Sequence, residues 1–496
     1  MAEEKTTAAA ENIGGAIYDA RTLGTPRMVV LGLQHMFAMF GATVLVPLIT
    51  GLDVSTTLLF AGLGTLLFHF ITKMKVPAFL GSSFAFLGGY AAITGLADDN
   101  MTQAQLLPYA CFGVACAGLV YLILAAVIKA FGTKTVMKYF PPVVTGPIII
   151  AIGLGLAPSA ISNCSTNWLV AFSALIVVIL FNIWGIGMMR IIPIIMGVIV
   201  SYVVAILCHE VDFTPIKDAA WIGSPIHWSN TVFGGVDFSN SSLVLTAVIA
   251  IVPIALATMM EHIGDISAIS ATVGKNYIAD PGLHRTLTGD GLATTIASLF
   301  GAPANTTYGE NTGVLALTKV YDPKVIRIAA CFAAVLSFSP KFAAIIHTIP
   351  TATIGGISFV LYGMISAAGL RNLVESHVDF SKSRNLIIAA IILVSSLGLK
   401  ANTLASGETI DGIQFNLGTL TITLSALAVG SLAGILLNAI LPGKDYVFDE
   451  TDPKDTGADL SLENAVLDKQ KEYGEKKKEK KEAKKAKVTP VTKDDE

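Results

Sequence analysis

Charged side chains are scarce over most of this chain, and that scarcity limits the folds open to it. Of 33 basic and 36 acidic residues, only 17 of each lie in residues 28–442. Hydrophobic residues make up 53% of the 496 positions and charged residues 14%, whereas soluble domains carry about 25% charged residues. A soluble body of this size needs a charged surface, and a disordered chain needs low hydrophobicity. The sequence therefore excludes both classes and predicts a membrane protein.

Apolar stretches recur along this body, and a membrane-spanning helix needs about 20 mostly apolar residues. We predict about 14 segments in an all-α polytopic membrane fold. They run roughly over residues 28–50, 54–72, 77–96, 107–129, 138–158, 167–186, 190–208, 241–270, 287–301, 303–318, 325–340, 343–369, 384–399 and 418–441. The third and tenth segments are short, polar and interrupted by Gly and Pro, so we expect them to be broken. The polar N-terminal residues lack the apolar core of a signal peptide.

The basic residues of the predicted loops set an orientation. With a cytoplasmic N-terminus, 14 Lys and Arg residues fall in inside loops, and only Lys217, Lys341 and Lys400 fall in outside loops. Because cytoplasmic loops are enriched in Lys and Arg, both termini are predicted to be cytoplasmic.

These assignments divide the chain into five regions. They are a cytoplasmic N-terminal segment (1–27), a first set of seven segments (28–208), an extracytoplasmic loop (209–240), a second set of seven segments (241–441) and a charged cytoplasmic tail (442–496). The tail contains a Lys/Glu run at 469–487. Such a run either attracts anionic lipid or is a solvated tail, and its glutamates favour the solvated reading.

The two broken segments occupy matching positions in the two halves. PAFLGSSFAF begins at Pro77 and PANTTYGENTG at Pro303, an offset of 226 residues that also relates His35 to Glu261. An odd number of segments per half inverts the second copy, so we predict two inverted seven-segment repeats. This arrangement is typical of transporters with a site at the repeat interface near the bilayer midplane. Half-helices after Ser83 and Glu310 would aim backbone N–H groups at that site.

Four acidic residues lie inside apolar segments, namely Glu261, Asp265, Asp290 and Glu310. A charged side chain in a membrane helix costs roughly 2.5–3.5 kcal/mol on insertion scales, so these residues are functional candidates. Glu261 and Asp265 are four residues apart and share a helix face. Like charges at that spacing favour protonation of one of them, which is what proton coupling needs. Asp290 is either functional or an acid near a helix N-terminus.

Two histidines accompany these acids. His35 is expected to fix the first helix against a broken segment through hydrogen bonds. His262 follows Glu261 but points about 100° away around the helix, and we interpret it as structural.

The residues at the broken segments indicate the kind of ligand. Phe84 and Tyr308 offer flat apolar faces beside the carboxylates of Glu261 and Glu310. Acceptor carboxylates and donor backbone amides together suit a small, planar, uncharged ring that carries N–H and C=O groups. A cation channel would use rings of acids without aromatic plates, and an anion would be repelled by the glutamates.

A membrane enzyme that uses the carboxylate pair as acid and base is an alternative of a different class. The sequence contains no HExxH, GxSxG or Cys/His cluster to support it. We expect no metal, no other cofactor and no nucleic-acid partner.

At these residues the sequence resembles the nucleobase–ascorbate transporter family. ENTGVLALTK (Glu310–Lys319), Gln34-His35 and EHIGD (Glu261–Asp265) match its motifs, and the likeness covers residues 28–441. Within the family, QHMFAMFGATVLVP, PAFLGSSFAF, DPGLHR and NTTYGEN look most like bacterial uracil permeases. Purine and xanthine members more often have glutamine where Glu310 stands.

The resemblance implies a fold with a core domain and a gate domain. The gate would comprise segments 5–7 and 12–14, and segments 3 and 10 would begin with short strands. Such permeases resemble proton symporters of the bacterial cytoplasmic membrane, and many form homodimers.

The resemblance also implies roles for particular residues. Substrate would be bound by Glu261, Glu310, Gly309, Tyr308, Phe84 and Ser83. Proton coupling or support would come from Asp265, Asn311, His35, Tyr362, Ser358 and Asp290. Some uracil permeases carry a second histidine where Asp265 stands, so this aspartate leaves the coupling residue open, along with the choice between uracil and purines.

Overall fold

The structure, a computed structural model, describes residues 16–99, 101–185, 189, 192–400, 402–403, 409–417, 420–443 and 446. The Lys/Glu run of the tail, the first 15 residues and Arg190 lie outside the described residues, as does the side chain of Glu310.

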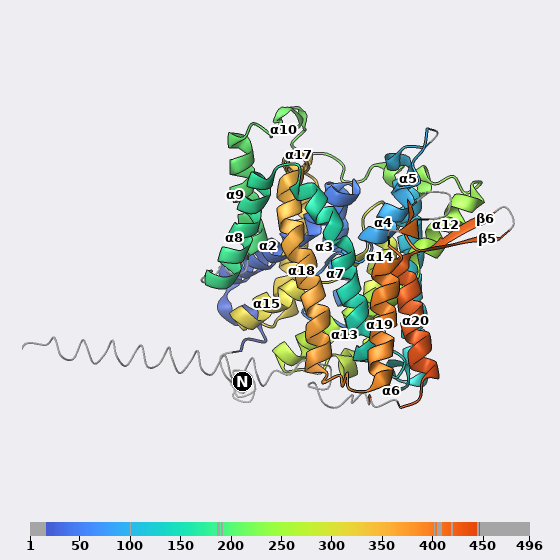
Figure 1. Cartoon of the computed structure of the whole chain (residues 1–496). Helices are drawn as coiled ribbons and strands as arrows, with labels where there is room; N and C mark the ends of the chain where they lie inside the picture. The colour runs from blue at the N-terminus through green and yellow to red at the C-terminus, as the bar shows by residue number, and fades with distance from the viewer. Residues whose placement is uncertain are drawn as a thin grey trace, which may run out of the picture.

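Helices dominate the described chain (Figure 1). Within the described residues, six spans are long and apolar enough to cross a membrane: α2 (Thr25–Thr50), α3 (Val54–Ile71), α5 (Gln103–Phe131), α7 (Pro142–Cys164), the joined α12 (Ser241–Ile251) and α13 (Ile254–Val273), and α18 (Thr351–Glu375). Shorter helices occupy other predicted segments: α8 (Trp168–Trp184), α9 (Pro193–Leu207), α14 (Leu283–Leu299), α19 (Ser383–Gly398) and α20 (Ala426–Ile440). The protein is therefore a multi-pass helical membrane protein.

The third and tenth segments are broken, and each begins with a strand. The third contains β1 (Leu80–Ser82) and α4 (Leu87–Thr94), and the tenth contains β2 (Asn305–Thr307) and α15 (Gly309–Thr318). Each predicted repeat thus supplies one strand and one half-helix.

Two predicted boundaries are wrong. The segment predicted at 343–369 is divided: α17 (Pro340–His347) bends away from α16 (Pro323–Leu336) by 89°, and α18 starts only after Pro350. The segment predicted at 418–441 is helical only from Ala426, because β5 (Ile413–Leu417) and β6 (Leu420–Leu424) form an antiparallel hairpin before it. LTITL (420–424) alternates apolar residues with threonine and is rich in β-branched residues, and both features favour that strand. A smaller pair, β3 (Asn402–Thr403) and β4 (Thr409–Ile410), precedes the hairpin.

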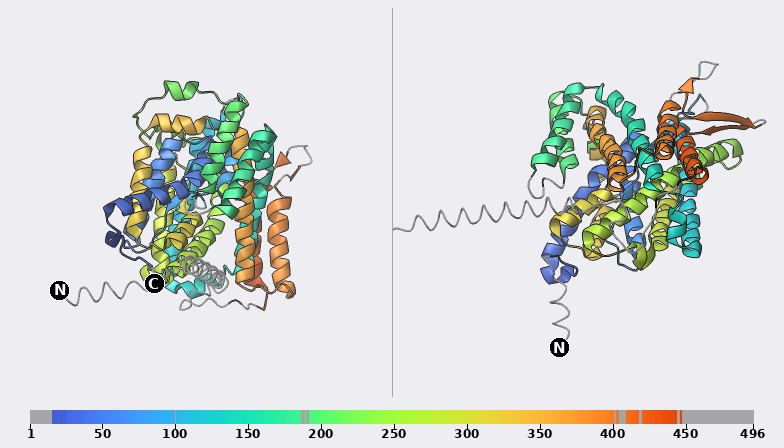
Figure 2. Two further views of the ribbon diagram at one scale, coloured as in Figure 1. Left: turned by 90° about the vertical axis from the view of Figure 1, so that its left-hand side faces the viewer. Right: turned by 60° about the horizontal axis from the view of Figure 1, so that its bottom comes forward.

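The membrane helices pack in two groups. In one, α2, α3, α5, α12, α14 and α16 pack against one another, and in the other α7, α8, α9, α18, α19 and α20 do so. The second group contains the segments expected to form the gate. Figure 2 shows α19 and α20 (orange) beside α7 and away from α2 and α3 (blue).

Glycines allow close packing within each group. A Cβ at Gly153 of α7 would lie 2.3 Å from the Tyr362 carbonyl oxygen of α18. A Cβ at Gly118 of α5 would lie 2.7 Å from the Gly291 carbonyl oxygen of α14. Small residues at helix interfaces are typical of membrane proteins, because they let helix backbones approach.

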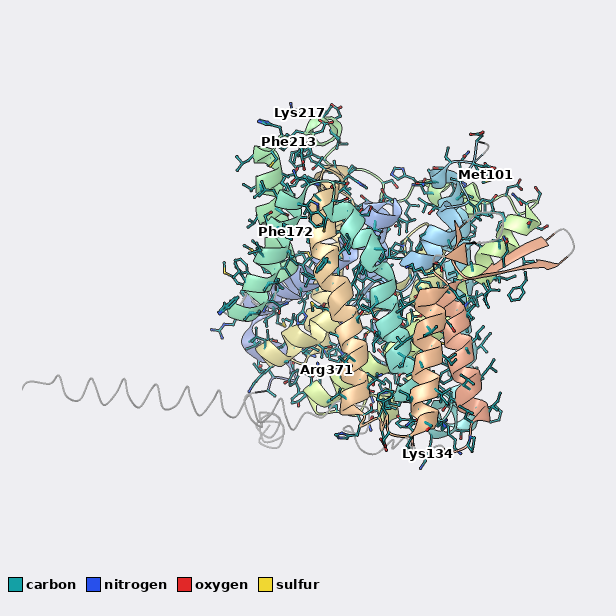
Figure 3. The ribbon with its side chains drawn as sticks, in the orientation of Figure 1. Met101, Lys134, Phe172, Phe213, Lys217 and Arg371 are labelled. Atoms are coloured by element: carbon teal, nitrogen blue, oxygen red, sulfur yellow. The ribbon has the colours of Figure 1, made fainter. Side chains whose placement is uncertain are left out.

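Contacts among the loops show which loops lie at each end of the molecule. Lys75 pairs with Asp280, and the Asn438 side chain donates to the Lys138 carbonyl. At the opposite end, Lys341 N–H donates to the Ala220 carbonyl. Figure 3 shows Lys134 and Arg371 at one end and Lys217 at the other. Lys75, Lys134, Lys138 and Arg371 of the inside loops thus lie at one end, and Lys217 and Lys341 of the outside loops at the other, whereas Lys400 contacts the Gly155 carbonyl in the middle of α7.

The N-terminal strap, which we define as residues Ile17–Leu23, crosses the end that carries the inside loops. The Ile17 N–H donates to the Lys319 carbonyl after α15, and the Tyr18 hydroxyl donates to the Val273 carbonyl at the end of α13. The Ala20 N–H donates to Asp322 Oδ2 before α16. The strap therefore ties together the ends of the helices that carry Glu261 and Glu310.

Candidate functional site

A two-stranded antiparallel sheet joins the broken segments at the centre of the protein. Leu80 pairs with Thr307, Gly81 with Thr306 and Ser82 with Asn305. The Ser83 N–H donates to the Ala304 carbonyl and the Tyr308 N–H to the Phe79 carbonyl, each over 2.9 Å. The two broken segments are thus held face to face by backbone hydrogen bonds.

Threonine side chains form hydrogen bonds with the backbone groups on the outer edges of both strands, in the same way in each strand. Thr65 Oγ1 of α3 accepts from the Leu80 N–H and donates to the Leu80 carbonyl. Thr294 Oγ1 of α14 accepts from the Asn305 N–H and donates to the Asn305 carbonyl. An exposed strand edge inside a membrane would leave backbone groups unpaired, which is costly. The matched threonines lie on the second and ninth segments, the equivalent positions of the two predicted repeats.

Tyr308 packs back over the sheet. Its hydroxyl donates to the Ser82 carbonyl over 2.9 Å and accepts from Thr43 Oγ1 of α2 over 3.3 Å. The side chain is buried, and a Cβ on Gly81 would lie 2.5 Å from its ring. The ring therefore braces strand β1, and substrate contact by Tyr308 stays a prediction.

The half-helices begin beside this sheet. Neither Phe86, which precedes α4, nor Tyr308, which precedes α15, caps its helix with a side-chain hydrogen bond. The first backbone N–H groups of a helix have no partner within the helix and favour acceptors. Gly309 opens α15, and Glu310 follows it in the first turn. Both half-helices can therefore present donors to a ligand carbonyl.

Glu261 and Asp265 share a face of α13, and both are partly exposed. Asp265 lies beside the start of α15, because its Oδ1 would be 3.3 Å from a Cβ on Gly309. Its Oδ2 accepts from Thr307 Oγ1 over 3.2 Å. The structure thus brings Asp265 against β2 and α15.

A buried polar cluster lies behind Asp265. Asp290 Oδ1 accepts from the Thr307 N–H over 3.0 Å, and Asp290 Oδ2 lies 3.3 Å from His262 Nδ1. His262 Nδ1 also lies 3.2 Å from Thr307 Oγ1. Asp290 is in the middle of α14 and fully buried, so its interpretation as a helix N-terminal acid is wrong. The cluster anchors strand β2 to α13 and α14.

His35 contacts the second half-helix. The Asn311 side-chain amide lies 3.3 Å from His35 Nδ1 and 3.4 Å from the His35 carbonyl, and both side chains are buried. This contact joins α2 to α15, as expected for a histidine that fixes the first helix against a broken segment.

An aromatic contact joins the first broken segment to α18. The Phe84 ring stands edge-on to Tyr362 of α18, with centroids 6.4 Å apart. Tyr362 and Ser358 are both buried, four residues apart on α18. Ser83 is also buried, and no described residue pairs with its hydroxyl.

Sequence reasoning missed three polar residues of this region: Thr307, Thr43 and Tyr121. Tyr121 of α5 is buried and within electrostatic range of Glu261, Asp265 and Asp290. Thr307 could have been found, since it stands in the polar run NTTYGEN of a broken segment.

Two broken, strand-tipped segments that face each other inside a helical membrane protein are typical of transporters. The chain belongs to the permease family, whose sequence profile matches residues 26–404. It is a transporter and not an enzyme, and the resemblance found in its motifs is confirmed.

The curated relatives of this chain include several proteins named uracil permease. That of Bacillus caldolyticus is 40% identical over 437 residues, covering 86% of this chain and 94% of the relative. That of Bacillus subtilis is 39% identical, covering 85% and 94%. That of Escherichia coli K12 is 37% identical, covering 83% and 90%.

Solved structures show the fold at low sequence identity. The transmembrane domain of the cyanobacterial bicarbonate transporter BicA matches with a TM-score of 0.54 and 14% identity, covering 77% of this chain and 97% of that domain. The anion transporter SLC26A9 matches with a TM-score of 0.56 and 12% identity, covering 85% of this chain and 66% of that protein. These likenesses concern the fold alone.

Proposed function

We propose that this protein takes up uracil across the bacterial cytoplasmic membrane together with protons, by alternating access. Uracil is proposed as the substrate because the chain is similar over nearly its full length to proteins named uracil permease. The sheet-centred site adds chemical support. Carboxylates on α13 and α15 would accept from ring N–H groups, and the uncapped half-helices would donate to ring carbonyls.

The proposed coupling ion is the proton. Glu261 and Asp265 share one face of α13, and Asp290 and Tyr121 lie close behind. Several acids in a poorly solvated site favour protonation of one of them. Protonation of Glu261, Asp265 or Glu310 would remove the penalty for occluding a bare carboxylate, and the gate would then move.

Two features support alternating access. The helices pack in two groups, and Phe84 of the core meets Tyr362 of the gate beside the site. The site is also open: Gly264, Gly309 and Gly313 are exposed, and a Cβ at Gly264 or Gly313 would meet no described atom within 4 Å. A gate group that rocks against the core could close this opening and form another on the opposite side. Protonation biases the two states only through a difference in affinity.

The remaining proposals concern orientation and assembly. Both termini are proposed to be cytoplasmic, because the basic inside loops share an end with the N-terminal strap. A homodimer through gate helices is proposed from the family resemblance. The apolar, exposed face of α8, with Trp168, Phe172 and Ile176, would serve as a contact.

Uptake of radiolabelled uracil into proteoliposomes tests the proposal. We expect accumulation above equilibrium under an inward proton gradient and its collapse with a protonophore. Accumulation of xanthine in place of uracil would point to the purine alternative within the same family. Uracil accumulation that ignores both proton gradient and protonophore would overturn proton coupling while leaving the substrate in place.

A further inference from the structure

The contacts of the buried cluster behind Asp265 determine which of its atoms donate hydrogen bonds and which accept them. His262 Nδ1 faces two oxygens, Asp290 Oδ2 at 3.3 Å and Thr307 Oγ1 at 3.2 Å. Asp290 Oδ2 is not aligned for a hydrogen bond with Nδ1, but its negative charge 3.3 Å away favours a proton on Nδ1 over a lone pair there. The other ring nitrogen, Nε2, has no hydrogen-bond partner among the described residues and can remain unprotonated. The charge of Asp290 therefore favours the tautomer of His262 that is protonated at Nδ1.

The tautomer in turn fixes the Thr307 hydroxyl. A threonine hydroxyl has one proton to donate and lone pairs with which to accept. Because Thr307 Oγ1 accepts from His262 Nδ1–H, its own proton is directed to Asp265 Oδ2, 3.2 Å away. The Thr307 backbone cannot rotate away, since its N–H is held by Asp290 Oδ1 and its strand pairs with β1.

We infer that Thr307, held as a donor by His262 and Asp290, stabilises the Asp265 carboxylate and so sets the pH at which Asp265 takes up a proton. These three are positioning residues: they act on substrate only through Asp265. The inference rests on the proposed proton coupling. It also assigns His262 a part in the coupling, although its sequence position suggested a structural role.

The other titratable groups facing this part of α13 are of the same sign or neutral. Among the side chains that the structure describes, they are Glu261 on α13, Asp290 on α14 and Tyr121 on α5. All of the acids among them oppose ionisation of Asp265 when charged. The donated Thr307 proton works against that repulsion, so its loss has a defined sign: Asp265 becomes easier to protonate.

The test compares Thr307→Val, which keeps the shape but lacks the hydroxyl, with Thr307→Ser, which keeps the hydroxyl. Uracil uptake by the full chain in proteoliposomes is measured against pH. A hydrogen bond donated to a carboxylate stabilises its charged form, so Thr307→Val should move the pH midpoint of uptake upward by about one pH unit or more. Thr307→Ser should keep the wild-type midpoint. If the pH midpoint of Thr307→Val equals that of the wild type, whatever the uptake rate, Thr307 does not set the protonation of Asp265 and the inference is wrong.

Infrared difference spectroscopy gives a readout that does not need transport. The carbonyl band of protonated Asp265, identified by its loss in Asp265→Asn, should appear at higher pH in Thr307→Val and in His262→Leu than in the wild type. His262→Leu also serves if Thr307→Val does not fold. If the wild-type protein takes up no nucleobase, the proposed function is wrong. The infrared band would still show whether Thr307 and His262 control the protonation of Asp265. An Asp265 band that titrates identically in all folded variants would overturn the inference.

Discussion

The phenolic hydroxyl of Tyr308 donates a 2.9 Å hydrogen bond to the main-chain carbonyl of Ser82, 226 residues earlier in the chain. That separation equals the offset between the two predicted repeats. In the structure, the matched strand contacts equate Leu80 with Asn305 and Ser83 with Tyr308. The bond therefore joins Tyr308 to the residue next to its counterpart in the first half. The two broken segments are thus fastened by a side chain as well as by the strands.

Tyr308→Phe removes this bond and the contact with Thr43. We expect the free energy of unfolding to fall by on the order of 1 kcal/mol, and the KM for uracil to rise because β1 loses its brace. Thermal unfolding in detergent and initial uptake rates measure both. Tyr109→Phe is the control, since its hydroxyl bonds the Asp237 backbone far from the site: it should lower stability and leave the KM unchanged. An unaltered KM in Tyr308→Phe would contradict the role of the brace.

Gly81→Ala places a methyl group 2.5 Å from the Tyr308 ring. Overpacking of this kind typically costs about 1–3 kcal/mol, and it would push apart the two segments that form the site. We expect a lower melting temperature and strongly reduced uptake. Gly88→Ala, in the adjoining half-helix, meets no described atom within 4 Å and should be tolerated. Equal uptake by the two variants would show that the approach of Tyr308 to Gly81 does not matter.

Glu310→Gln retains the shape and an acceptor but removes the negative charge at the start of α15. We expect uracil uptake to be lost and xanthine to compete better for binding, since the family's purine members more often carry glutamine there. Competition assays with labelled uracil measure this. Glu210→Gln, on an exposed loop, should transport normally. Uptake by Glu310→Gln at the wild-type rate would remove Glu310 from the site.

Asp322→Ala should release the N-terminal strap. Asp322 accepts from the Ala20 N–H over 2.9 Å and caps α16 through the Lys324 N–H. Loss of a helix cap costs about 1 kcal/mol, and the strap loses an anchor as well. We expect trypsin to cleave faster after Arg21, as followed by mass spectrometry. Asp53→Ala removes the cap of α3, which lies away from the strap, and should leave that cleavage rate unchanged.

Much of the architecture could be predicted because it depends on local sequence. Apolar length, loop charge and the Gly/Pro interruptions located the spans, the two ends and the broken segments. Two segment boundaries were missed. Pro350 separates α17 from α18 although the apolar run continues. Residues 413–424 (IQFNLGTLTITL) alternate apolar and polar side chains, which is typical of a strand, but the prediction joined their second half to the apolar helix that follows.

The acidic residues near the broken segments could be predicted from the sequence, but their hydrogen-bond partners could not. Glu261, Asp265 and Asp290 were identified because charge in a membrane segment is costly. Their partners could not be identified, because hydrogen bonds such as Thr307 to Asp265 depend on how distant segments meet. His262 was assigned away from Glu261 correctly, but the element it faces, α14, is set only by tertiary packing.

The shared sheet also constrains the order in which the protein can be assembled. When ribosomes have made the first half, β1 is present but its partner at residues 305–307 is not. Unpaired backbone N–H and C=O groups are costly in lipid. Until β2 is made, we expect the first half to remain partly folded in the membrane, with β1 held against α2 and α3 by the hydrogen bonds to Thr43 and Thr65. A chain that terminates before β2 would carry an unfinished strand, and we expect quality-control proteases to remove it. Synthesis of the second half thus completes the first.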